Sequence, residues 1–200
     1  MDPLTVFFLV RHGEALSNTL RIPDAFPGDP SIGLTEKGFE ESKRIASQIC
    51  ESGLDILFTS PMRRTRETAE VVASVCGDIS LRFDRRLRET DFGVWSGTSY
   101  DEFLSRYPSP LNRIEGNPVE RLEGLLSIRE RISEFLRDTS AEYAGKHITI
   151  VSHSDPLAQL RGVLMGESIE QAVTGWQPSS GQPVRIDVDT EMLTRIVSGK

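Results

Sequence analysis

The sequence predicts one α/β domain built around a mostly parallel sheet. Apolar runs of strand length alternate with segments of helical periodicity over residues 5–83, and this alternation is typical of a parallel α/β sheet. With 200 residues, the chain is long enough to bury a sizeable core. Because no internal repeat, low-complexity tract or linker interrupts it, we expect residues 1–200 to form a single domain.

The first strand is expected at residues 5–10, where six apolar or β-branched residues follow one another. Residues 15–33 contain three prolines and two glycines with little periodicity, which predicts a long loop of the kind that often carries function. Thr35 is a suitable N-cap for a helix through about Glu51.

A second strand at residues 55–59 is followed by a helix over residues 63–76 and by a third short strand at residues 79–83. Residues 90–118 break this pattern, because they are rich in aromatic residues, glycine, proline and serine. We interpret them as an insertion that forms a lid over the edge of the sheet, followed by a long helix over residues 119–143.

The last third of the chain predicts another strand and two helices. The second strongly buried strand is expected at residues 148–152, and a helix should begin near Pro156, because proline suits the first helical turn. A further short helix is expected after Ser168, which has the spacing of a capping box with Gln171. The final apolar runs predict a closing hairpin, with strands at residues 184–188 and 193–197.

Charge and composition argue against several classes of protein. The net charge is −7 and there is no block of basic residues, so nucleic acid is not expected as a partner. No apolar run is long enough to span a membrane, and the chain starts without the positive region of a signal peptide. We interpret Cys50 and Cys76 as two reduced core thiols of a cytoplasmic protein. The sequence does not determine the oligomeric state, and a homodimer stays open.

Reactive side chains follow three of the predicted strands. Arg11 and His12 end the first strand, Arg64 lies in the opening turn of the helix after the second, and His153 follows the strand before Pro156. Since parallel strands share their carboxyl edge, these four residues should meet at one site. Two guanidinium groups can hold a dianionic phosphoryl group, one imidazole can attack phosphorus, and the second can stabilise charge on the equatorial oxygens.

Departure of an ester oxygen requires a proton donor, and two carboxyl groups compete for this role. Glu89 precedes a turn-like segment, and a carboxyl group beside a phosphate site should have a raised pKa. Asp155 is the alternative because it lies close to His153 in the sequence. Four further arginines either extend the positive field towards a second anionic group or are solvated surface residues: Arg21, Arg106, Arg113 and Arg121.

The order of short motifs resembles the histidine phosphatase superfamily, also called the phosphoglycerate mutase-like family. Any one motif is a weak signal, but six in the expected order, spread over most of the chain, are specific. They are R-H-G-E at residues 11–14, Asn18, L-T-x-x-G at 34–38, S-P-x-x-R with T-A at 60–69, L-x-E-x-x-x-G-x-W-x-G at 87–97, and V-S-H at 151–153.

The resemblance implies a three-layer α/β/α sandwich with a variable lid, and a phosphohistidine on His12. Arg11, Arg64 and His153 would complete the phosphate pocket. Glu89 would first donate a proton to the leaving group and then act as the base for the attacking water.

The resemblance also implies two further substrate contacts. Asn18 would contact the phosphate, as would the backbone N–H of Ser154, which stands where the family usually has glycine. No metal and no other cofactor is implied, and the expected substrate is a small phosphomonoester.

Departures from the family pattern concern the substrate more than the reaction. Ala15 stands where the mutases carry serine, and residues 117–121 replace the common P-x-G-E-S segment. The long lid of the mutases is not recognisable. These differences favour a phosphatase acting on a small phosphorylated metabolite over a phosphoglycerate mutase. A non-catalytic module that binds a phospho-ligand is a third alternative, disfavoured because every expected catalytic residue type is present.

Overall fold

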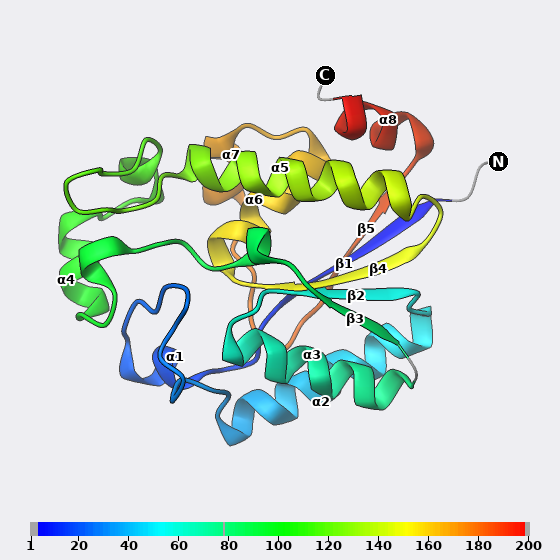
Figure 1. Ribbon diagram of the computed structural model, residues 1–200, viewed down its shortest axis with the longest axis horizontal. Coiled ribbons are helices and arrows are strands. Elements are labelled where there is room, and N and C mark those ends of the chain that lie inside the picture. Colours follow the sequence, from blue (N-terminus) through cyan, green and yellow to red (C-terminus); the bar gives the residue numbers. More distant parts are fainter. Residues whose placement is uncertain (1–3, 78, 199–200) are drawn as a thin grey trace.

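The computed structural model describes residues 4–77 and 79–198 and has a five-stranded sheet at its centre (Figure 1). The strand order is β3-β2-β4-β1-β5, and β5 alone runs antiparallel to its neighbour. The mostly parallel sheet expected from the sequence is therefore confirmed. Its strands are β1 (Thr5–Arg11), β2 (Ile56–Thr59), β3 (Ser80–Phe83), β4 (His147–Ser152) and β5 (Val184–Val188).

Helices cover both faces of the sheet, which gives the three layers expected (Figure 1). One face carries α2 (Glu36–Ser52) and α3 (Arg63–Cys76), and the other carries α5 (Leu125–Glu142), α6 (Ser154–Met165) and α8 (Thr190–Ser198). The shorter helices are α1 (Leu16–Leu20), α4 (Tyr100–Arg106), α7 (Ile169–Gly175) and the 3-10 helices η1 (Arg85–Leu87), η2 (Gly93–Trp95) and η3 (Pro110–Arg113). Within the described residues, no helix has both the length and the apolar character needed to cross a membrane.

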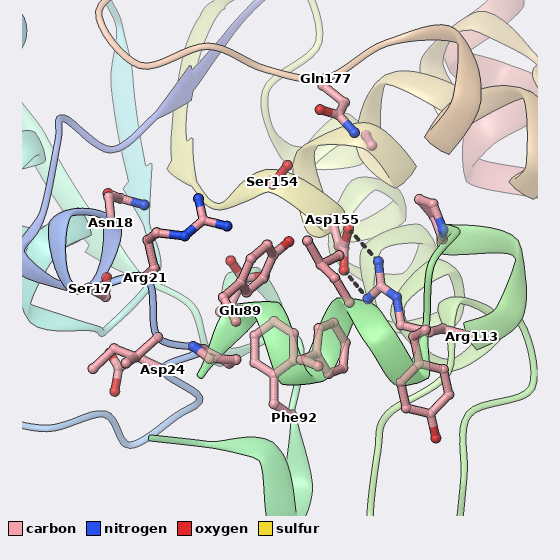
Figure 2. A pocket seen from close by; sticks show the side chains of 18 of the residues that line it. Ser17, Asn18, Arg21, Asp24, Glu89, Phe92, Arg113, Ser154, Asp155 and Gln177 are labelled. Atoms are coloured by element: carbon pink, nitrogen blue, oxygen red, sulfur yellow. Dashed lines mark hydrogen bonds and ion pairs between the residues drawn. The ribbon is translucent and has the colours of Figure 1, made fainter. Parts of the chain in front are cut away.

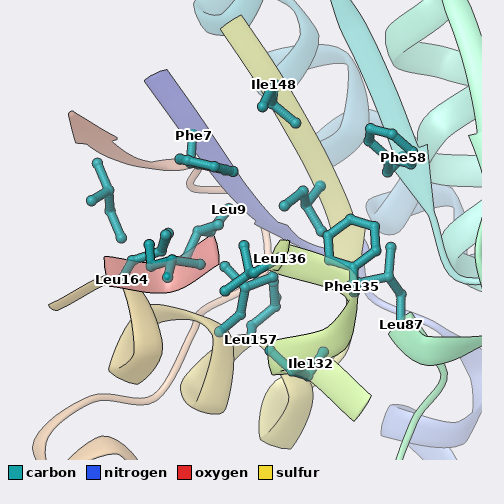
Figure 3. Packing of buried hydrophobic residues seen from close by; sticks show 14 of the residues in the cluster. Phe7, Leu9, Phe58, Leu87, Ile132, Phe135, Leu136, Ile148, Leu157 and Leu164 are labelled. Carbon is teal, nitrogen blue, oxygen red and sulfur yellow. The ribbon is translucent and has the colours of Figure 1, made fainter. Parts of the chain in front are cut away.

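Burial on both faces explains why the central strands are continuously apolar. Phe7 and Leu9 of β1 point into the core beneath α5 and α6 (Figure 3). There, Phe135 of α5 packs edge-on against Phe58 of β2, with 5.3 Å between ring centroids. The alternate residues of β1 pack against α2 on the opposite face: Val6, Phe8 and Val10. The alternation follows from the two-residue repeat of side-chain direction along a strand.

Residues 90–118 build a small aromatic cluster beyond the carboxyl ends of the parallel strands. Phe103 of α4 is fully buried there. It packs against Phe92 and Tyr107, with ring centroids 5.3 and 5.4 Å away. This cluster is separate from the two cores on the sheet. It holds α4 in place by packing against Phe103.

The helix expected from residue 119 begins later, at Leu125. Asn117 and Leu122 exchange two backbone hydrogen bonds, both 2.9 Å long, which close the intervening residues into a turn. The backbone of Arg121 adopts a left-handed conformation within this turn, with φ of 54°. These six residues therefore satisfy their backbone groups locally and do not extend the helix.

The predicted hairpin at the C-terminus is wrong in its second half. The first of its two apolar runs forms β5, but the second forms α8. Asp189 begins the helix, since its carboxylate accepts the backbone N–H of Met192 at 2.8 Å. Leu193 and Ile196 are three residues apart and both bury against the core. This spacing fits one face of a helix, and it is the signal that the strand interpretation missed.

The expectation of two reduced thiols is also wrong, because Cys50 and Cys76 form a disulfide. They lie near the carboxyl ends of α2 and α3, which pack side by side on one face of the sheet, and their Cα atoms are 5.1 Å apart. Packing of the two helices brings these cysteines within the reach of a disulfide. The pairing also removes the argument for a cytoplasmic location that rested on reduced cysteines.

Replacing Phe135 with alanine should lower the free energy of unfolding by about 3–5 kcal/mol, because a fully buried ring is lost and a cavity remains. Urea unfolding followed by circular dichroism measures this change. Glu134→Ala, at the exposed neighbouring position, is the control and should stay within about 0.5 kcal/mol of the wild type. A loss below about 1 kcal/mol for Phe135→Ala would contradict the packing of α5 on the sheet.

Candidate active site

The carboxyl ends of two adjacent strands bring the two predicted site histidines together. Arg11 of β1 pairs with Ser152 of β4, so His12 and His153 are the next residues on neighbouring strands. Their ring centroids are 5.2 Å apart, and both side chains are buried. The parallel sheet thus joins two residues that lie far apart in the sequence, at the edge where α/β folds bind ligands.

Hydrogen bonds fix the tautomer of the His12 imidazole. Its Nδ1 lies 2.8 Å from the carbonyl oxygen of Gly13, which can only accept, so Nδ1 carries the hydrogen. Nε2 therefore has a free lone pair, towards which Nε of Arg64 donates at 3.2 Å. Burial, together with the charges of Arg64 and Arg11, holds the pKa of His12 well below its ordinary value. The unprotonated Nε2 has the form that a nucleophile requires.

Two glycines allow the segment that carries His12 to pack closely against the start of α2. A Cβ atom on Gly13 would lie 2.3 Å from the carbonyl oxygen of Gly38, and a Cβ on Gly38 would lie 2.1 Å from that of Glu14. The backbone N–H of Gly13 also donates to the hydroxyl of Thr68 at 3.1 Å. The glycines of R-H-G-E and L-T-x-x-G are therefore required by contact between these two motifs.

Arg64 is held with one edge of its guanidinium towards His12. The residue lies in the first turn of α3 and is 3% exposed. Its two terminal nitrogens donate to Asp24, Nη1 to the side-chain carboxylate and Nη2 to the backbone carbonyl. The Nε edge remains directed at Nε2 of His12. A guanidinium fixed in this way can offer its Nε–H to a phosphoryl group bound at His12.

His153 is oriented by Ser60. Nε2 of His153 lies 2.9 Å from the Ser60 hydroxyl. That hydroxyl also accepts the backbone N–H of Met62 at 3.4 Å, and it can donate its own hydrogen to Nε2. The imidazole hydrogen is then on Nδ1, which is buried without a partner among the described residues. Burial, followed by the charges of Arg64 and His12, lowers the pKa of His153. His153 is thus a neutral donor for an anionic oxygen.

A cavity of about 430 Å³ lies at this edge of the sheet (Figure 2). Its wall includes Arg11, His12 and Arg64, together with the two predicted substrate contacts Asn18 and Ser154. The Asn18 amide oxygen accepts a backbone N–H, and its amide nitrogen points towards the cavity in Figure 2. Ser154 is the first residue of α6, so its backbone N–H lies at a helix N-terminus, where anions are favoured.

Two carboxyl groups border the cavity in different environments (Figure 2). Asp155 accepts from Nη1 of Arg113 at 2.6 Å and from the Thr90 hydroxyl at 2.8 Å. Burial acts to raise the pKa of Asp155, but Arg113 and the hydrogen bond from Thr90 outweigh it and the pKa is lowered. Glu89 lies 3.9 Å from Nδ1 of His153. Its pKa is raised by burial and, further, by the charge of Asp155. Glu89 is thus the carboxyl group held towards its protonated form.

Arg131, a buried residue of α5, holds the backbone around Glu89 by hydrogen bonds. Arg131 donates to the carbonyl oxygens of Arg86 and Glu89. Its Nε also donates to Glu123 at 2.9 Å, and Glu123 in turn accepts the backbone N–H of Asp91 at 3.0 Å. The position of Glu89 is therefore set from a helix of the main core.

Three residues of the site had no predicted role. Ser60 belongs to the S-P-x-x-R motif, and that motif was the signal that could have identified it. Asp24 lies in the long loop, where no local pattern marks it. Arg113 was one of four arginines left open, and the structure buries it against Asp155. Arg21 also lines the cavity, whereas two of the four do not: Arg106 and Arg121.

Comparison with known proteins identifies the family. The family model of the histidine phosphatase superfamily (branch 1) matches residues 7–190, and the chain belongs to this family. It is 27% identical over 167 residues to phosphoserine phosphatase 1 of Hydrogenobacter thermophilus, covering 82% of this chain and 77% of that protein. It is 29% identical over 163 residues to a probable phosphoglycerate mutase GpmB of Erwinia tasmaniensis, covering 80% of this chain and 74% of that protein.

The solved structures support the same conclusion. Bacillus stearothermophilus YhfR superposes with a TM-score of 0.79 at 26% sequence identity, covering 93% of this chain and 92% of that one. The resemblance found in the motifs therefore extends to the arrangement of the strands and helices.

The buried neutral histidines should make the stability depend on pH. The folded-state pKa values of His12 and His153 are lowered, whereas each titrates near 6.5 when unfolded. The free energy of unfolding should therefore be highest above pH 6.5. It should fall as the pH drops below 6.5, because only the unfolded chain takes up protons at these two histidines. Between about pH 6 and 5, the wild type should lose about 1 kcal/mol more than His153→Gln in urea titrations. Equal losses would contradict a neutral, buried His153.

Proposed function

We propose that the protein is a phosphomonoesterase that acts through a phosphohistidine at His12. The observation that carries the proposal is the set of groups around Nε2 of His12. That atom carries the lone pair of the imidazole, and Nε of Arg11 and Nδ1 of His153 are buried without a partner among the described residues. Buried donors without partners cost free energy. A phosphoryl group at His12 would accept hydrogen bonds from both.

In the first step, Nε2 of His12 attacks phosphorus, and the bond from phosphorus to the ester oxygen breaks. Glu89, held towards its protonated form, gives its proton to that oxygen, which leaves as an alcohol. Arg11, Arg64 and His153 donate hydrogen bonds to the three equatorial oxygens and so stabilise the charge of the transition state. The product of this step is phosphohistidine.

In the second step, the Glu89 carboxylate takes a proton from water as the water oxygen attacks phosphorus. The bond from phosphorus to Nε2 of His12 breaks, and inorganic phosphate leaves. Both residues return to their starting protonation states, so one water is consumed and one alcohol is released in each cycle. Neither step requires a metal, and we propose that the reaction is metal-independent.

His12→Ala should abolish hydrolysis of 4-nitrophenyl phosphate, with a loss in kcat of at least about 10³-fold, because the nucleophile is removed. His147→Ala is the matched control. That residue lies at the start of β4 with its Nδ1 beside the carbonyl of Gly53, outside the cavity wall, and its replacement should leave kcat unchanged.

A phosphoryl label that is labile in acid should appear on the wild type and on His147→Ala but not on His12→Ala. Normal turnover by His12→Ala would end the proposal. A wild type that binds phosphate esters but neither turns over nor becomes labelled would instead be a non-catalytic binding module.

Glu89→Gln should lower kcat/KM for an alkyl phosphate by about 10²–10⁴-fold, because the alcohol then leaves without a proton; kcat/KM reports the first step and is independent of the role of Glu89 in the second. The loss should be much smaller for 4-nitrophenyl phosphate, whose leaving group needs no proton. Since the acid form of Glu89 is lost as the pH rises through its raised pKa, kcat/KM for the alkyl ester should decline over that range. This decline should be absent in Glu89→Gln. Asp155→Asn serves as the comparison, and a larger loss in that variant would make Asp155 the donor.

A phosphoglycerate mutase is the second candidate, because several relatives are named probable phosphoglycerate mutase GpmB. A mutase must protect its phosphohistidine from water. We expect release of phosphate to exceed isomerisation of 3-phosphoglycerate, measured with and without bisphosphoglycerate. Isomerisation that is faster than phosphate release would favour the mutase.

A further inference from the structure

We infer that this site prefers monophosphates of uncharged, ring-bearing alcohols over phosphorylated acids and amino acids. The inference rests on the proposed function, because it concerns the leaving group of that same reaction. It is carried by the outer part of the cavity, between α1, α4, η3 and the segment after α7.

The arginines of this outer part already have acidic partners. Arg113 is buried and paired with Asp155 at 2.6 Å, and Arg21 forms an ion pair with Asp101. Among the described residues, the cavity wall contains no other lysine or arginine apart from the two arginines of the phosphate site. A carboxylate on the substrate would lose hydration, and it could reach the buried Arg113 only by displacing Asp155. At Arg21 it would compete with Asp101 for an exposed guanidinium, where an ion pair contributes little.

A substrate ammonium group meets the same difficulty. Three carboxyl groups line the cavity. Asp24 is bound to Arg64, and Asp155 is bound to Arg113. Glu89, the third, is held towards its neutral form by its buried surroundings. In the outer cavity, the buried charges are therefore paired or held towards their neutral form, and the exposed cation, Arg21, faces Asp101.

Aromatic and apolar side chains make up much of the remaining wall. Tyr100 and Leu104 are four residues apart on α4, so they share one face of the helix, and they are 36% and 37% exposed. Tyr100 packs on the buried Phe103, with 5.8 Å between ring centroids. Trp176 and Val173, from the end of α7, also line the cavity.

These side chains suit a planar apolar group, which aromatic rings contact through their faces and edges. A cavity of about 430 Å³ is much larger than a phosphoryl group and leaves room for a ring. The phosphoryl group would occupy the end lined by His12, and the ring would lie towards α4.

The inference is tested with esters whose alcohols have comparable acidity, so that differences in rate do not arise from differences in leaving-group pKa. We would measure kcat/KM for 2-phenylethyl phosphate, 3-phosphoglycerate and O-phosphoserine. We expect the phenylethyl ester to exceed both acids by at least about tenfold, because burial of a phenyl ring alone contributes this much. An equal or greater kcat/KM for either acid overturns the inference.

A new charge in the wall provides the second test. Leu104→Arg places an unpaired cation beside the leaving group, and we expect it to raise kcat/KM for 3-phosphoglycerate relative to 2-phenylethyl phosphate by about fivefold or more. Leu126→Arg is the matched control, because Leu126 is 38% exposed on α5 and outside the cavity wall. That variant should leave the ratio unchanged. An unchanged ratio in Leu104→Arg counts against the inference.

Calorimetry with His12→Ala separates this inference from the proposed function. Tighter binding of 2-phenylethyl phosphate than of 3-phosphoglycerate supports the inference even if the wild type hydrolyses none of the esters, in which case only the proposed reaction fails. Tighter binding of 3-phosphoglycerate overturns the inference even if hydrolysis is observed.

Discussion

The hydrogen bond from Nδ1 of His12 to the carbonyl oxygen of Gly13 is the interaction on which the rest of the site depends. It determines which nitrogen of the imidazole has a lone pair, and therefore where a phosphoryl group can attach. Gly13 and Gly38 also allow the segment that carries His12 to pack closely against the start of α2. Burial and the two neighbouring arginines then keep the ring unprotonated. Under the proposed function, the positive surroundings that suit a phosphate dianion thus also keep His12 in the form that a nucleophile requires.

The same principle separates the two carboxyl groups. Burial acts in the same direction on Glu89 and Asp155, and Arg113 makes much of the difference, because it is hydrogen-bonded to the Asp155 carboxylate. The ionised Asp155 then raises the pKa of Glu89 further. Because Arg113 lies in η3, within residues 90–118, this segment influences the proton chemistry as well as the shape of the cavity.

Most of the sheet and its catalytic edge could be predicted, because the information there is local. β1 and β4 are continuous apolar runs that end in reactive side chains, and short motifs mark Arg64 and Glu89. Two of the failures involve contacts between segments that are far apart in the sequence. The disulfide depends on how α2 packs against α3, and the path of the long loop decides that Asp24 reaches Arg64. Two other failures have local causes. The late start of α5 reflects hydrogen bonds at Asn117 that apolar periodicity does not reveal, whereas the helical form of α8 was indicated by the spacing of Leu193 and Ile196 and by the cap at Asp189.

The attachment of Glu89 to α5 through Arg131 has an evolutionary consequence. The carboxyl group takes its position from a helix that is part of the interior, while the wall that meets the leaving group belongs to the neighbouring segment with α4. Substitutions or insertions in that segment can accumulate without moving the acid. A lineage with this architecture is therefore free to change the compounds it acts on while it retains a single way of breaking the bond.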